Sequence, residues 1–156
     1  QAVITKVGGP GREFWIESTN TNYTAKLDRA AAEPGAWRVE ISPDSPRKSH
    51  RFLHVLSVMD ADATVGPKVG LINAGEFVGT QMLDFTVLFS TDAQEHNAVS
   101  FSLNAGKAYR VLVCDVQPGH WRILREGQLV SELQATAEGK CIFFRGEPGR
   151  YLLERR

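Results

Sequence analysis

Four histidines are the side chains of this sequence best suited to proton transfer or metal binding near neutral pH: His50, His54, His96 and His120. His50 and His54 are four residues apart, the spacing of zinc ligands on one helix face. Their segment, however, has the composition of a strand and lacks the His-Glu-x-x-His order, so we predict no zinc site. We expect His54 to lie in the core with its ring nitrogens bonded to backbone groups, as a buried polar side chain requires.

Asp60 and Asp62 form the one candidate calcium site in the sequence. They follow an apolar run and could offer two carboxylates to Ca²⁺, which prefers oxygen ligands. The alternative, which the sequence favours, is that both are solvated turn residues. Size requires no cofactor, because a chain of 156 residues can bury a sizeable core by itself.

Motifs of common catalytic and phosphate-binding sites are missing from the sequence. It contains no Gly-x-Ser-x-Gly elbow for a nucleophilic serine. The glycine-rich residues 8–11 lack the Lys-Ser/Thr pair of a phosphate-binding loop, and we interpret them as a tight turn. Serine hydrolase and P-loop chemistry therefore have no support in the sequence.

Aromatic and basic side chains form the remaining candidate site. Sugar rings stack on Trp and Tyr, and Arg holds the carboxylate or sulfate of an acidic sugar through paired hydrogen bonds. We predict a carbohydrate-binding set that consists of Arg12, Trp15, Tyr23, Arg38, Trp121 and Arg122. The alternative for each tryptophan is a place in the core, because large aromatic side chains supply much of the buried area of a β-sandwich.

The elements that must position these residues have the pattern of β-strands. Short runs rich in Val, Ile, Phe, Trp and Tyr alternate with Gly, Pro, Asn and Asp, which is typical of strands and turns. The predicted strands are residues 2–7, 13–17, 37–42, 51–59, 69–72, 76–79, 82–90, 98–103, 108–115, 121–125, 128–136, 140–145 and 151–154. One short helix is predicted over residues 27–33. The fold class is therefore all-β, an antiparallel two-sheet, jelly-roll-like β-sandwich with little or no helix.

Apolar periodicity and turn signals predict how these strands are arranged. Residues 51–59 and 85–89 are apolar at both odd and even positions, so we expect both faces of these central strands to be covered. Glycine turn signals predict successive hairpins in the C-terminal third of the chain, at Gly106, Gly119, Gly127, Gly139 and Gly149.

Composition bounds the class of protein. With 18 basic and 18 acidic residues the formal net charge is zero, so we predict no nucleic-acid partner. No apolar run approaches the roughly 20 residues that span a bilayer, and the first residues do not resemble a signal peptide, so we predict no membrane partner. Cys114 and Cys141 lie in apolar runs, which favours core positions, and one disulfide between neighbouring strands is the alternative. We predict one domain over residues 1–156.

Several segments of the sequence resemble one enzyme family. VGGPGREFW at residues 7–15, PGAWRVEISP at 34–43 and FLHVL at 52–56 are similar to the C-terminal β region of heparinase II/III-like polysaccharide lyases. The closing segments resemble the final strands of the same region: VQPGHWRI at residues 116–123, REG at 125–127 and GRYLL at 149–153.

The resemblance implies a place within a larger enzyme. Such enzymes have an N-terminal α-helical toroid followed by β-sandwich layers, and they cleave uronic-acid-containing polysaccharides by β-elimination. Their catalytic Tyr and His lie upstream of the matched part, so we carry over no catalytic residue. The resemblance implies the C-terminal part of a longer chain, an extracellular or periplasmic location, and an acidic polysaccharide or the catalytic part of the parent chain as partner.

The leading hypothesis is a non-catalytic carbohydrate-binding or accessory β-sandwich of a polysaccharide lyase. The first alternative is a purely structural domain that packs on its parent enzyme, which an exposed apolar patch would support. The second alternative is a small self-contained polysaccharide lyase.

Overall fold

The computed structural model describes residues 2–9, 15–22, 37–46, 48–60 and 62–156. They divide into two compact units, residues 1–50 and residues 51–156. The helix predicted over residues 27–33 lies outside the described residues. Within them, no helix has the length and apolar character needed to cross a membrane.

The described residues of the first unit include two pairs of strands. Strand β1, Ala2–Gly8, pairs antiparallel with β4, Trp37–Pro43. Strand β2, Trp15–Ile16, pairs with β3, Thr21–Asn22, across the 3₁₀ turn η1 at Glu17–Thr19.

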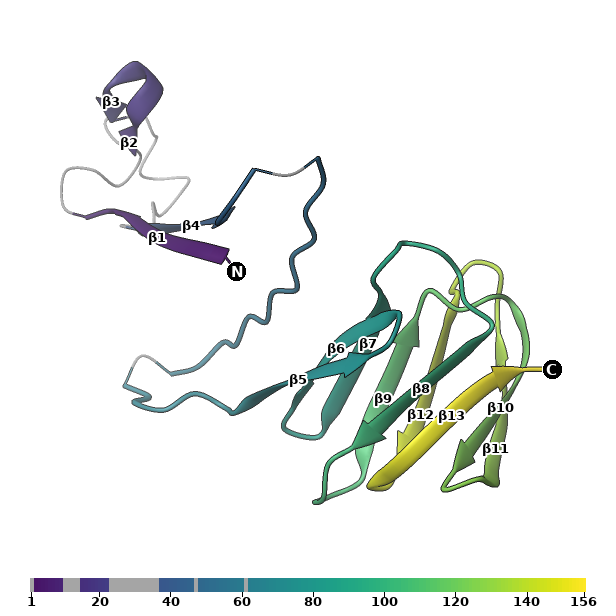
Figure 1. The fold of residues 1–156 in the computed structure, drawn as a ribbon. Coiled ribbons are helices and arrows are strands. Elements are labelled where there is room, and N and C mark those ends of the chain that lie inside the picture. The colour runs from purple at the N-terminus through teal and green to yellow at the C-terminus, as the bar shows by residue number, and fades with distance from the viewer. Residues whose placement is uncertain (1, 10–14, 23–36, 47, 61) are drawn as a thin grey trace. The chain divides into compact units, whose positions relative to one another are not determined.

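The second unit holds a sandwich of two sheets (Figure 1). One sheet has the strand order β12-β9-β7-β6-β5 and the other has the order β11-β10-β13-β8. The first consists of β5 (Val69–Ala74), β6 (Phe77–Met82), β7 (Phe85–Ser90), β9 (Tyr109–Cys114) and β12 (Cys141–Gly146). The second consists of β8 (Ala98–Leu103), β10 (Gly119–Arg125), β11 (Gln128–Ala135) and β13 (Gly149–Arg155). Neighbouring strands are antiparallel except β7 and β9, which are parallel.

Alternation of side chains along each strand builds the core between the two sheets. In β8, for example, Val99, Phe101 and Leu103 are buried while the intervening residues are exposed. The largest fully buried side chains include Trp121, Phe77, Leu88, Ile123, Ile142 and Leu153. This pattern and the described strands confirm the predicted all-β sandwich.

Three backbone positions require glycine or a positive φ. A Cβ atom on Gly79 would collide with the backbone oxygen of Val87 on the neighbouring strand, so only glycine fits. Between β10 and β11, Glu126 has φ 49° and Gly127 has φ 80°, the two positive values that a tight two-residue hairpin uses.

Several predicted details are wrong. Residues 51–59 do not form a strand, and Leu56 and Val58 are 86% and 102% exposed. Among the described residues no strand pairs with this segment, so its backbone makes no inter-strand hydrogen bonds of a sheet. The predicted strand 82–90 is interrupted by a turn in which Leu83 has φ 55°.

The predicted series of hairpins is also wrong. Strands β10 and β11 are paired neighbours, whereas β8 to β9, β9 to β10, β11 to β12 and β12 to β13 each pass from one sheet to the other. The glycines lie in turns or at the first residue of a strand, as Gly119 and Gly149 do, but turn residues do not determine which strand the chain pairs with next. That residues 1–156 form one domain stays a prediction.

Candidate functional site

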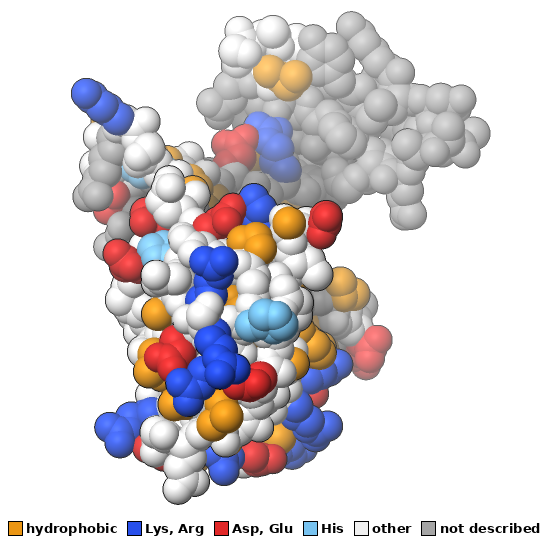
Figure 2. Space-filling model, turned by 90° about the vertical axis from the view of Figure 1, so that its right-hand side faces the viewer, with side chains coloured by type: hydrophobic (Ala, Val, Ile, Leu, Met, Phe, Trp, Pro, Cys, Tyr) orange, Lys and Arg blue, Asp and Glu red, His pale blue; other side chains and the backbone are white. Residues whose placement is uncertain are grey.

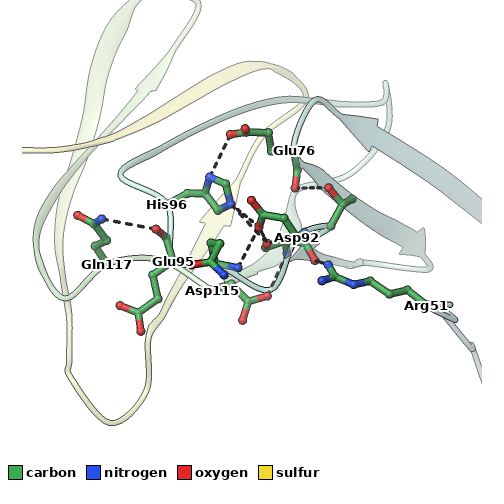
Figure 3. Close-up of polar contacts among 10 residues, drawn as sticks. Arg51, Glu76, Asp92, Glu95, His96, Asp115 and Gln117 are labelled. Carbon is green, nitrogen blue, oxygen red and sulfur yellow. Dashed lines mark hydrogen bonds and ion pairs between the residues drawn. The ribbon is translucent and has the colours of Figure 1, made fainter. Parts of the chain in front are cut away.

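A polar cluster closes one end of the sandwich, where loops from both sheets meet (Figure 3). His96, just before β8, lies between Glu76 of the β5–β6 turn and Asp92 of the loop after β7. Its Nδ1 is 3.0 Å from Glu76 Oε2 and its Nε2 is 2.9 Å from Asp92 Oδ1. Ser90 Oγ donates to the same Asp92 oxygen at 2.5 Å.

Backbone contacts fix the loops that carry this cluster. The amide of Ser90 donates to Asp115 Oδ2 at 3.0 Å, and the amide of His96 donates to the Asp115 carbonyl at 2.9 Å. Arg51 Nη1 donates to the carbonyl of Ser90 at 3.3 Å, so the segment before β5 also reaches the cluster. The cluster therefore ties the ends of β7 and β9 to the start of β8.

The electrostatics of the cluster favour a charged imidazole. The hydrogen bond to Asp92 raises the pKa of His96 above its ordinary value of 6.5, and Glu76 adds to the effect against the opposing cost of burial. Hydrogen bonds from Ser90, from the Gln94 amide and from His96 hold the pKa of Asp92 far below its ordinary range.

The cluster contains serine, histidine and aspartate, but its hydrogen bonds are not those that nucleophilic catalysis requires. Both ring nitrogens of His96 are within bonding distance of a carboxylate, which leaves neither free to accept a proton. Ser90 Oγ lies 3.4 Å from His96 Nε2 and donates to Asp92 instead. A general base must accept the proton of its nucleophile, so the cluster is suited to holding loops together.

The raised pKa of His96 gives a prediction about pH. Since its folded-state pKa exceeds the unfolded value of about 6.5, the charged form contributes stability that is full below that pH and is lost as the pH rises through the folded pKa. We expect His96→Gln to lower the free energy of unfolding by about 1–2 kcal/mol near pH 5.5 and by less near pH 8.5. Urea titrations at both pH values measure the difference, with His120→Gln on the exposed side of β10 as the control. Equal losses at the two pH values would contradict the ion-pair description.

The second feature of this unit is an apolar surface on the outer side of the five-stranded sheet. Strand register places the side chains of Leu71, Thr80, Val87, Leu112 and Phe143 in one row across that side. One neighbouring row runs from Val69 to Arg145 in the same register, and on the other side a shorter row joins Asn73, Val78 and Phe89. We define the apolar face as Val69, Leu71, Val78, Met82, Phe85, Val87, Phe89, Leu112 and Phe143.

Five of the nine side chains of the apolar face are exposed and the other four are half-buried. Leu71 is 68% and Phe143 59% exposed, while Phe85 and Phe89 are 40% and 39% exposed. The prediction that both faces of residues 85–89 are covered is therefore wrong for the described structure: Thr86, Leu88 and Ser90 are buried, and the phenylalanines face outward. An antiparallel sheet with one side in water normally carries polar side chains there.

Charged groups border the apolar face at the beginning of β7. Arg110 donates through Nε and Nη2 to both carboxylate oxygens of Asp84, at 3.0 and 2.9 Å, and its guanidinium carbon lies 3.5 Å from the centre of the Phe85 ring. The bond to Arg110 lowers the pKa of Asp84.

Residues 51–59 lie in the same unit and add exposed apolar side chains. Ser57 Oγ lies 3.5 Å from Met82 Sδ, at the border of the apolar face. His54, which we expected in the core, is exposed, with its ring 5.7 Å from that of Phe52. The expectation is wrong because its segment does not enter either sheet.

The predicted carbohydrate-binding residues are divided between the two units, Arg12, Trp15, Tyr23 and Arg38 in the first and Trp121 and Arg122 in the second. Arg12 and Tyr23 lie outside the described residues, and Trp15 is placed in β2 by its backbone. Arg38, on β4, donates from Nε to Glu40 Oε1 at 2.7 Å. Whether these four residues bind sugar stays a prediction.

Trp121 and Arg122 lie on opposite sides of β10. Trp121 is 0% exposed and its Nε1 donates to the Gln117 carbonyl at 2.9 Å, so its ring has no free surface on which a sugar could stack. Trp121 therefore occupies the core, which was the alternative to sugar binding in the sequence analysis. Arg122 lines a groove of about 600 Å³ and donates to Glu154 Oε1 at 3.0 Å. Figure 2 shows acidic and basic side chains interspersed on the side of the molecule where β10 and β11 lie.

Asp60 and Asp62 are both exposed, and the Ala63 amide donates to the Asp60 carbonyl at 3.0 Å, as in a turn. In the part of the chain that the structure describes, no three His, Cys, Asp or Glu side chains are grouped to hold a metal ion. Calcium binding by the two aspartates alone stays a prediction.

A groove lies between the edges of β5 and β8. It has a volume of about 760 Å³ and combines polar and apolar walls. Its polar lining includes Asn73, Ser100, Ser102, Asn104 and Arg150. Arg150 donates to Glu126 Oε2 from Nε at 3.2 Å and from Nη2 at 3.1 Å, so its charge is already paired.

The fold and the surface define the class of protein. It is an all-β domain with a buried core between two sheets, a polar cluster that holds loops together, and an apolar face on the outer side of one sheet. The sequence model of the heparinase II C-terminal domain matches residues 71–155, which span all of the sandwich except the first two residues of β5. The match covers more than half of the chain, and the chain belongs to this family, an accessory domain of polysaccharide lyases. A comparison with curated protein sequences found no match.

Sequence reasoning missed both the polar cluster and the apolar face. For the cluster, a usable signal was the Ser-x-Asp order at the end of an apolar run with a histidine four residues later, which is typical of a side-chain-capped turn. For the apolar face, the signal was the apolar character at both parities, which we interpreted as burial between neighbours within the chain.

Proposed function

We propose that this chain is a non-catalytic accessory domain that packs, through its apolar face, on the catalytic part of a polysaccharide lyase acting on uronic-acid-containing glycans. The observation that carries the proposal is the apolar character of both sides of the five-stranded sheet. One side builds the sandwich core and the other is exposed. Contiguous exposed apolar surfaces of this kind mark protein interaction sites.

Family membership supports the choice of occupant. The heparinase II C-terminal domain takes its name from its position in a longer lyase chain, so the remainder of such a chain is the partner that the family suggests. The border of the apolar face fits a protein partner, because Arg110 is held by Asp84 and offers no free positive charge to an acidic glycan. An extracellular or periplasmic location, where polysaccharides are met, belongs to the same proposal.

The first unit is consistent with packing on a larger protein. Its β1–β4 pair leaves Ile4 70% and Val39 63% exposed. A two-stranded sheet is marginally stable in water unless another layer covers it.

Mixing the chain with a separately expressed catalytic part of a lyase of this family tests the proposal. We expect a one-to-one complex in sedimentation velocity with both proteins at about 100 μM. Failure to form a complex at that concentration, with both proteins folded, would rule out packing as the function.

A second candidate, binding of an acidic glycan, is favoured by the groove between β5 and β8. Amide and hydroxyl groups from Asn73, Ser100, Ser102 and Asn104 match sugar hydroxyls, and Leu71 and Leu152 offer apolar contact. A uronate carboxylate would have to compete with Glu126 for Arg150.

Titration with heparin, hyaluronate, chondroitin sulfate and alginate distinguishes the candidates. Glycan binding in this groove predicts saturable binding that Arg150→Ala weakens roughly tenfold, which corresponds to the loss of one charged hydrogen-bond partner. Arg145→Ala, on the far edge strand of the other sheet, is the matched control. Absence of saturable binding to all four glycans eliminates this candidate, and formation of unsaturated uronate during the titration would instead show a self-contained lyase.

A further inference from the structure

Cys114 and Cys141 face each other across two neighbouring strands. They are direct Cα partners in the antiparallel register of β9 and β12. Both point to the outer side of the five-stranded sheet, since the next residues inward along the strands, Val113 and Ile142, are buried in the core. The predicted core position of both cysteines is therefore wrong, and both are free thiols that are partly exposed.

Strand geometry places such a pair within the reach of a disulfide. Directly opposed residues of an antiparallel pair have Cα atoms about 4.5 or 5.5 Å apart, depending on whether the pair is hydrogen-bonded. Natural disulfides span Cα distances of about 4.4–6.8 Å. Either type of register position therefore allows the bond without moving the two strands apart.

The cysteine pair is half-buried at the edge of the apolar face. The apolar face flanks it, with Phe143 two residues further along β12, and the β7–β9 pairing ends one residue before Cys114, at Leu88 and Val113. Burial, with contributions from Cys141 and Asp115, raises the pKa of Cys114 to about 11. The contribution from Cys141 reflects the closeness of the two sulfurs.

The topology gives the bond a structural consequence. Between the two cysteines the chain leaves the five-stranded sheet, forms β10 and β11 of the other sheet, and returns as β12, an edge strand. A disulfide at this position would join the two ends of the intervening segment and hold the edge strand β12 to β9. Closing this loop removes conformational entropy from the unfolded chain, which is the main source of disulfide stabilisation.

We propose that Cys114 and Cys141 are a modification site at which a cross-strand disulfide forms in an oxidising compartment. The oxidant is a low-molecular-weight disulfide. One cysteine thiolate attacks it, forms a mixed disulfide and displaces the first small thiol. The second cysteine attacks the protein sulfur of the mixed disulfide and displaces the second small thiol. Two protein thiols are oxidised, one small disulfide is reduced to two thiols, and the protons of the cysteines pass to the departing thiolates.

Oxidation of the whole chain with glutathione disulfide tests the proposal. The fully reduced protein is incubated with excess glutathione disulfide at about pH 8.5, where more thiolate is present, and is then treated with N-ethylmaleimide. We expect a protein about 2 Da lighter than the reduced form, without maleimide, and a linked peptide pair containing both cysteines after digestion. We also expect a melting temperature roughly 5–15 °C above that of the reduced protein.

Cys114→Ser and Cys141→Ser are the matched controls, and each should carry one glutathione or one maleimide. Two maleimides or two glutathiones on the wild-type chain, or disulfide-linked dimers as the main product, would overturn the proposal. A linked protein that melts at a lower temperature would contradict the inference that the native register accommodates the bond. None of these outcomes depends on the proposed packing of the apolar face, so the two proposals fail separately.

Discussion

Replacing Trp121 by alanine will lower the free energy of unfolding by roughly 3–5 kcal/mol, the range for truncation of a large buried aromatic side chain. Trp121 is 0% exposed and stands on β10 between neighbours on β11 and β13. The variant leaves a cavity between the sheets and removes the donor to the Gln117 carbonyl. Urea denaturation followed by far-UV circular dichroism measures the loss.

His120→Ala is the control for this prediction, because His120 is the exposed neighbour on the same strand and should change stability by less than about 0.5 kcal/mol. Trp121→Phe should fall between the two, since it keeps most of the ring volume and loses the hydrogen bond. A loss below about 1 kcal/mol for Trp121→Ala would show that this tryptophan does not support the core.

The double variant Leu71→Ser with Phe143→Ser will bind the catalytic part of the lyase about a hundredfold more weakly than the wild-type chain does. The two side chains lie at opposite ends of one row of the apolar face and are 68% and 59% exposed. Burying most of a Leu or Phe side chain stabilises an interface by about 1.5–3 kcal/mol, so each replacement costs at least about tenfold in affinity. The sites are separated by three strands, so their effects should add.

Leu152→Ser on β13 is the matched control for the double variant. Leu152 is 37% exposed on the outer side of the other sheet, and its replacement should leave affinity unchanged. Stability of all three proteins is compared first, because an exposed apolar residue contributes little to folding. Equal weakening by Leu152→Ser and by the double variant would contradict the assignment of the interface to the apolar face.

Local patterns in the sequence predict the strands well and their partners poorly. The strand predicted over residues 98–103 has the bounds of β8, and the side chains of this strand alternate between buried and exposed because one side meets the core. The parallel pairing of β7 with β9 has no local signal, since it brings together segments separated by β8. The same limit explains why glycine turns suggested hairpins where the chain changes sheets.

Residues 51–59 are apolar at both parities, but neighbouring strands of the chain do not cover them as we predicted. Their apolar character at both parities indicates cover on both sides, and we assigned that cover to neighbouring strands of the chain. The described structure leaves Val58 102% exposed, with no strand paired to this segment among the described residues. A sequence shows that a segment needs cover, but it does not show what molecule provides it.

The candidate site was predictable only in part. Ser90, Asp92 and His96 are close in sequence, whereas Glu76 and Asp115 reach them through the pairing of distant strands. Trp121 and Arg122 are adjacent in sequence and were assigned to one site, yet strand geometry sends their side chains to opposite sides of β10. Burial decides between a sugar platform and a core residue, and burial depends on the whole fold.

Hydroxyl-radical footprinting of Phe85, Phe89 and Phe143 tests the central claim most directly. Oxidation of these rings is measured in this chain alone and in the longer lyase chain of which we propose it is a part, with Leu152 as the internal control. Packing through the apolar face predicts that the three rings are labelled in the chain alone and protected in the longer chain, while Leu152 is labelled equally in both. Equal labelling of the three rings in the two proteins would contradict the claim.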